Sequence, residues 1–143
     1  MVRIRPELAR RIVREAAAVQ AKFPNRFALK LDQRGRPVWE GNVPVEGQEI
    51  PITVTYPAGY PGMPPILQTK LFLPVGCPHL LERDGRAATL CWIAPATQRR
   101  RARWDPQRHT AATVMRAAQR WFLACLVWQA TRIWPVADAW DFR

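Results

Sequence analysis

The sequence predicts one α+β domain over residues 1–143, built from a helix, a four-stranded antiparallel meander, a long loop and a second helix. Three observations support this class. Apolar residues recur at helical spacing near both ends of the chain, they alternate with polar residues between those ends, and residues 74–103 show no steady period. A chain of 143 residues can bury a core in one domain without disulfides.

The first predicted helix covers residues 6–22. Pro6 suits a first helical turn, and Pro24 ends the pattern. The apolar residues at helical spacing are Leu8, Ile12, Ala16 and Val19. We expect the arginines of this segment to form its solvent-exposed face.

The meander follows from alternation between apolar and polar residues. The predicted strands cover residues 27–31, 38–45, 50–56 and 66–73. A turn at residues 32–35 and a short hairpin loop at Glu46-Gly47 connect the first three strands. The prolines of residues 57–65 exclude a central strand or a helix there, because proline lacks the N–H donor, and they predict a rigid extended crossing.

The second helix is predicted to begin at Pro106, to reach about residue 133 and to end before Pro135. Its expected buried stripe consists of Ala111, Val114, Ala118, Trp121, Phe122, Cys125 and Gln129. The stretch 74–103 between the last strand and this helix is too long for an ordinary connection, which favours a functional loop.

The chain is strongly basic, with a formal charge of +11 and a sequence pI near 11.2. Such a charge fits acidic surfaces, phosphates or carboxylates as partners, and equally fits a well-solvated surface. Three cysteines make a poor disulfide framework and favour a reducing compartment. Without a signal peptide or a long apolar run, we expect a cytoplasmic protein with no membrane partner.

Cys91 is the candidate nucleophile, because a thiol in a loop is more open to activation than one in a core. Cys125 falls on the apolar stripe and should pack as a small hydrophobic residue, while Cys77 is intermediate. A zinc site from Cys77, His79, Cys91 and His109 is an alternative. The Cys77-x-His79 gap is shorter than structural zinc motifs use, so we expect no metal.

The order of motifs over roughly residues 7–130 resembles the catalytic domain of ubiquitin-conjugating enzymes. An N-terminal helix and a meander precede the segment Tyr60-Pro61-Gly62-Met63-Pro64-Pro65. His79, Gly85 and Cys91 follow, and Trp104-Asp105-Pro106 then resembles the family's helix start. The resemblance implies a ubiquitin-conjugating-enzyme-like fold in which residues 74–103 form a long active-site loop.

The resemblance also implies a thioester carrier that needs no cofactor. Cys91 would accept the C-terminal carboxyl of a ubiquitin-like or otherwise glycine-ended protein from an activating-type enzyme, and then yield it to a lysine amine. A thiolate suits this because it attacks an activated acyl group and leaves readily.

Two departures from the family pattern bear on the mechanism. The family's His-Pro-Asn triplet reads His79-Leu80-Leu81 here, so the asparagine associated with the oxyanion or its loop is absent. The Cys91 backbone, Thr89 or His79 are candidate replacements, although a loop histidine can also simply hold backbone carbonyls.

The second departure is a longer spacer between Cys91 and Trp104 that carries Arg99, Arg100, Arg101 and Arg103. This basic segment could dock an acidic acceptor or lower the Cys91 pKa, or it could be a solvated loop.

The short chain after the second helix resembles the compact bacterial ubiquitin-conjugating-like proteins. Several of these belong to antiphage operons such as cyclic-oligonucleotide signalling systems (CBASS), where a CD-NTase-type nucleotidyltransferase is the modified partner.

Two other functions stay open. One is a non-catalytic interaction module with the same fold. The other is a nucleic-acid binder that uses the arginines of residues 3–14 and 99–103. It is less favoured because no recognised nucleic-acid motif accompanies the charge.

Overall fold

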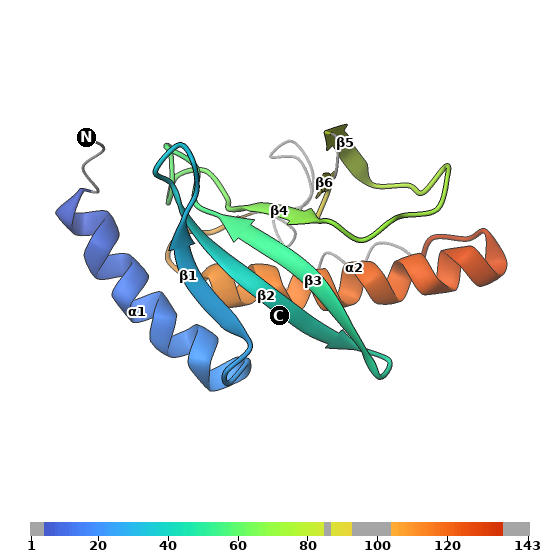
Figure 1. Ribbon diagram of the computed structural model, residues 1–143, viewed down its shortest axis with the longest axis horizontal. Helices are drawn as coiled ribbons and strands as arrows, with labels where there is room; N and C mark the ends of the chain where they lie inside the picture. Colours follow the sequence, from blue (N-terminus) through green and yellow to red (C-terminus); the bar gives the residue numbers. More distant parts are fainter. Residues whose placement is uncertain (1–4, 85–86, 93–103, 136–143) are drawn as a thin grey trace.

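The computed structural model describes residues 5–84, 87–92 and 104–135. Two helices and six strands follow in the order α1(Pro6–Lys22), β1(Phe27–Leu31), β2(Pro37–Val45), β3(Gln48–Thr55), β4(Ile66–Thr69), β5(Leu80–Asp84), β6(Ala87–Leu90) and α2(Ala111–Thr131) (Figure 1). The α+β class and the predicted bounds of the first helix are confirmed.

The six strands form one antiparallel sheet in the order β1-β2-β3-β4-β6-β5. The first four strands are consecutive neighbours, as a meander requires. Strand β3 alternates as predicted, with Ile50, Ile52 and Val54 buried and the residues between them more exposed. The crossing between β3 and β4 contains no helix or strand, and Tyr60 within it is fully buried.

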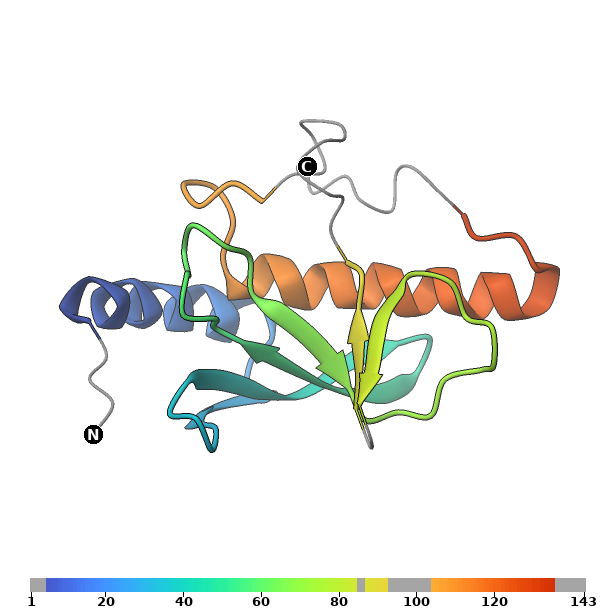
Figure 2. The ribbon, with the colours of Figure 1, turned by 90° about the horizontal axis from the view of Figure 1, so that it is seen from above.

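Both helices lie on the same side of the sheet, with α2 running across its face and α1 beside β1 (Figures 1 and 2). Strand side chains such as Val43, Val54 and Leu67 join Trp121 and Met115 of α2 in a single core cluster. Burial of this apolar surface is the main driving force for the fold. No helix among the described residues is long and apolar enough to cross a membrane.

The prediction of four strands is wrong, because residues 80–84 and 87–90 form two further strands within the supposed loop. The β5–β6 hairpin escapes a pattern search because β5 lies at the sheet edge and exposes Leu81, Glu82 and Arg83. The available signal was the Asp84-Gly85 pair, a dipeptide favoured in hairpin turns.

The predicted start of the second helix is also wrong, since α2 begins at Ala111. Thr110 is the N-cap residue, and its hydroxyl accepts a hydrogen bond from the backbone N–H of Ala112 at 3.2 Å. The Thr113 hydroxyl accepts from the Thr110 N–H at 3.0 Å, which completes a capping box. Pro106 lies instead in a preceding turn, where the His109 N–H donates to the Asp105 carbonyl.

The stripe on α2 is buried as predicted except for Gln129, which is exposed. The helix ends at Thr131, and Arg132 at the C-cap adopts a left-handed conformation.

Candidate functional site

Cys91 directly follows β6, between two deeply buried residues. Leu90 and Trp92 are buried in the core, while Cys91 is half-buried. The Trp92 indole N–H donates to the Pro65 carbonyl at 3.2 Å, which ties this strand end to the proline segment. Cys91 therefore lies at a fixed point at the end of the internal strand β6.

The loop before β5 holds Cys91 from the other side. The Cys91 N–H donates to the His79 carbonyl at 2.8 Å. His79 adopts a left-handed backbone conformation with φ of 60°, which is uncommon for a residue other than glycine. The structure therefore brings two of the predicted site residues together, through backbone and across a hairpin.

The His79 ring packs against Trp134, which follows α2, with ring centroids 4.8 Å apart. Trp134 also contacts Trp121 of α2 at 5.4 Å. Burial lowers the pKa of His79, so its imidazole is neutral near pH 7. A neutral imidazole supplies no positive charge to a nearby thiolate, but it can still donate or accept a hydrogen bond.

Burial raises the pKa of the Cys91 thiol. The raised pKa favours the protonated thiol at neutral pH, so reaction as a nucleophile needs a base or a cation that lowers this pKa. The arginines at positions 99, 100, 101 and 103, expected to lower this pKa or to dock a partner, lie outside the described residues.

Thr89 lies on β6 and is held by a neighbouring strand. Its hydroxyl accepts a hydrogen bond from the Gln68 side-chain amide at 2.9 Å. It also lines a cavity of about 510 Å³ together with residues of β4 and β5 and the arginines Arg34 and Arg36. Thr89 therefore has a structural partner of its own.

Trp92 and Trp104 frame the segment 93–103. Their rings are 6.2 Å apart and nearly perpendicular. The Trp104 indole N–H donates to the Pro61 carbonyl at 2.7 Å. The described chain thus stops at Trp92, next to Cys91, and resumes at Trp104, whose ring contacts that of Trp92.

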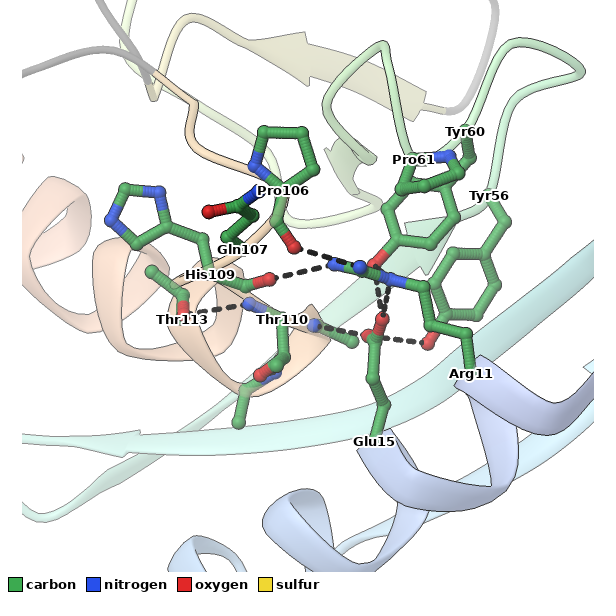
Figure 3. A network of polar contacts seen from close by, with 12 residues as sticks. Arg11, Glu15, Tyr56, Tyr60, Pro61, Pro106, Gln107, His109, Thr110 and Thr113 are labelled. Carbon is green, nitrogen blue, oxygen red and sulfur yellow. Dashed lines mark hydrogen bonds and ion pairs between the residues drawn. The ribbon is translucent and has the colours of Figure 1, made fainter. Parts of the chain in front are cut away.

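The buried carboxylate of Glu15 holds the start of α2 in place (Figure 3). Glu15 accepts hydrogen bonds from the Arg11 guanidinium, the hydroxyls of Tyr56 and Tyr60, and the backbone N–H of Ala111. Burial, followed by the bond to Glu15, raises the pKa of Tyr60 far above its usual value, so its hydroxyl remains a donor. The charge of Glu15 is thereby fully satisfied.

Arg11 extends this network to the turn before α2. Its guanidinium donates to the carbonyls of Pro106 at 2.7 Å and His109 at 2.9 Å (Figure 3). The expectation that all arginines of the first helix face solvent is therefore wrong for Arg11. A helical-spacing pattern could not reveal this, because the partners lie in a distant segment of the chain.

The other two cysteines pack together in the core. The sulfur atoms of Cys77 and Cys125 are 3.6 Å apart, and both side chains are buried. Burial and the neighbouring Cys77 raise the pKa of Cys125 to about 12, which fits its predicted packing role. No three histidine, cysteine or acidic side chains gather as metal ligands in the described part of the chain. The His109 ring nitrogen Nδ1 instead accepts the Asp105 N–H at 2.9 Å.

Comparison with protein families matches residues 15–141 to a family described as Type II CBASS E2 protein. The chain belongs to this family. It is therefore an E2-like protein of CBASS antiphage defence, as the resemblance to bacterial ubiquitin-conjugating-like proteins implied. The match to this E2 family extends over Glu15, His79, Cys91 and all of α2. Comparisons with curated proteins and with solved structures gave no match.

Proposed function

We propose that this CBASS E2 protein is an acyl carrier that uses Cys91 as its nucleophile. The observation that carries the proposal is the placement of Cys91. Its thiol is half-buried at a strand end, its backbone N–H donates to the His79 carbonyl, and the adjacent Trp92 is anchored to the Pro65 carbonyl. The chain's other cysteines are buried in the core, which leaves Cys91 as the accessible thiol.

The proposed reaction has two acyl transfers. The Cys91 sulfur attacks the activated C-terminal carbonyl of a ubiquitin-like or glycine-ended protein on an activating-type enzyme. A new C–S bond forms, the bond to the activating enzyme breaks, and the departing group takes up a proton. A lysine amine of the acceptor then attacks the thioester, an amide forms, and Cys91 leaves as a thiolate that is reprotonated.

The raised pKa of Cys91 suits the storage of an acyl group. A thiol of high pKa is a poorer leaving group, so its thioester resists attack until an amine is positioned against it. The His79 loop is the candidate for stabilising the oxyanion, because the Cys91 N–H already donates to the His79 carbonyl. Leu80 and Leu81 cannot replace the missing asparagine, because both are apolar and already belong to β5.

Membership of a CBASS family supports proteins of the same defence system as partners. An activating-type enzyme and a ubiquitin-like or glycine-ended protein would load Cys91, and a CD-NTase-type nucleotidyltransferase is a candidate acceptor. The arginines at positions 99, 100, 101 and 103 are proposed to dock the acidic surface of such a partner.

The deciding experiment is mass spectrometry of the protein purified with the products of neighbouring genes under non-reducing conditions. We expect an adduct on Cys91 that dithiothreitol removes. A Cys91→Ser variant should instead trap an ester that dithiothreitol does not cleave, and the added mass would identify the modifier.

The matched control is Cys125→Ala, which removes a buried thiol and leaves Cys91 in place. This variant should still form the labile adduct. If Cys91→Ala forms the same conjugates as the unchanged protein, the carrier mechanism is refuted and the non-catalytic interaction module is favoured.

A further inference from the structure

A basic groove lies where the end of α1 meets the beginning of α2. It encloses about 370 Å³, within the size range of small-molecule sites. Its lining residues come from the end of α1, the turn before α2 and the first half of α2, and they are Ala18, Lys22, Arg108, Thr110, Ala112, Thr113, Arg116 and Arg120. The basic groove contains neither Cys91 nor His79, so it is separate from the proposed acyl-transfer site.

All charged side chains that line the basic groove are positive. Four of its lining side chains are cationic and none is acidic. Among the described residues, the ion pairs do not include Lys22, Arg108 or Arg116. Like charges that converge on one cavity repel each other, and a bound anion relieves that repulsion.

Two hydroxyl groups add hydrogen-bond donors to the basic groove. The hydroxyls of Thr110 and Thr113 each accept a backbone N–H within the capping box. Within the described chain, neither hydroxyl donates to another residue, so each can direct its O–H at an anion. The first N–H groups of α2 are already bonded to Glu15 and Thr110, so the side chains must provide the recognition.

The lining also indicates which anion fits. Guanidinium groups form paired hydrogen bonds with phosphate oxygens, and hydroxyls complement them. None of the lining residues is aromatic, so the basic groove offers no surface on which a nucleobase could stack. We propose that the basic groove is a binding site for a small ligand carrying two or more phosphate groups, recognised through its phosphates alone.

The test is calorimetric titration of the full chain with inorganic tripolyphosphate at low ionic strength. We expect saturable one-to-one binding that weakens at least about tenfold in the Lys22→Gln/Arg116→Gln double variant, because two charge-assisted hydrogen bonds to the anion are lost. Both side chains are exposed, so the variant should fold. A nucleoside triphosphate should bind as tightly as tripolyphosphate.

The matched control is Arg10→Gln/Arg14→Gln, which removes the same net charge from exposed positions of α1 outside the basic groove. Its affinity should stay within about twofold of the unchanged protein. Equal loss in both double variants would refute the site, because the binding would then follow net charge alone. Tighter binding of a hexaglutamate peptide than of tripolyphosphate would also overturn the proposal.

A second measurement needs no variant. Acetic anhydride labelling followed by peptide mass spectrometry should show that tripolyphosphate slows acetylation of Lys22 and leaves Lys30 and Lys70 unchanged. Equal rates at Lys22 with and without tripolyphosphate would contradict the proposal. These experiments do not depend on acyl transfer by Cys91, so the two proposals can fail separately.

Discussion

Among the single residues, Cys91 is half-buried although both of its chain neighbours lie in the core. Its neighbours Leu90 and Trp92 are almost completely buried, and its own backbone is tied to His79. Burial disfavours the thiolate because a charge is less well solvated at this position. The described surroundings therefore position Cys91, and the burial that they impose raises its pKa.

This environment predicts slow alkylation of Cys91 in the isolated protein. With its pKa raised, the thiolate fraction at pH 7.5 is below that of a free cysteine, and the rate should keep rising past pH 9. Iodoacetamide labelling quantified on the Cys91 peptide at several pH values measures this, with free cysteine as the reference. A rate at pH 7.5 above that of free cysteine would show that cations, with the arginines of residues 93–103 as first candidates, lower the pKa.

At the scale of elements, one carboxylate joins α1 to α2. Glu15 receives donors from α1, from both buried tyrosines and from the first residue of α2. The Trp39 indole N–H donates to the Tyr56 hydroxyl at 2.8 Å and extends the network into the sheet. Removal of the carboxylate leaves several buried donors without an acceptor.

We therefore expect Glu15→Ala to lower the free energy of unfolding by about 3–5 kcal/mol, the range for breaking a buried, hydrogen-bonded charge pair. Chemical denaturation measures the difference. Glu40→Ala is the matched control, because Glu40 is exposed and its ion pair with Lys30 spans 3.5 Å. The Glu40→Ala substitution should lower the free energy of unfolding by less than about 1 kcal/mol. Equal effects of the two substitutions would contradict a central role for Glu15.

The β5–β6 hairpin is the element that positions Cys91. It widens the sheet and places the end of β6 opposite the His79 loop, which creates the position of Cys91. The Asp84-Gly85 signal could have predicted the hairpin. Its pairing with β4 could not be predicted, because short strands with exposed outer residues do not specify a neighbour.

For the whole molecule, the packing of the helices on one face of the sheet buries the core, and burial favours the neutral form of both histidines. Burial lowers the pKa of His79. Burial also lowers the pKa of His109, and the charge of Arg108 adds to this effect while that of Asp105 opposes it. Protonation would additionally break the bond from the Asp105 N–H to the His109 ring.

The stability of the fold should accordingly fall on mild acidification. Both folded-state pKa values lie below the unfolded value of about 6.5, so the unfolded chain binds more protons as the pH drops from 7 to 5. Urea denaturation at both pH values should show a lower free energy of unfolding at pH 5. The difference should shrink in a His79→Gln/His109→Gln variant, and an unchanged difference would assign the pH effect to other groups.

The sequence by itself determined the α+β class, the bounds of α1, the inward face of β3 and the order of motifs that placed Cys91 in a ubiquitin-conjugating-like family. These features depend on periodicity, proline positions and spacing, which are local properties of the chain. The contacts between distant segments arise only when the chain folds. Tertiary structure turned Arg11 inward, buried Glu15 and added β5 and β6 to the sheet beside β4. Each of these depends on a partner that lies far away in the sequence, and so no local pattern could specify them.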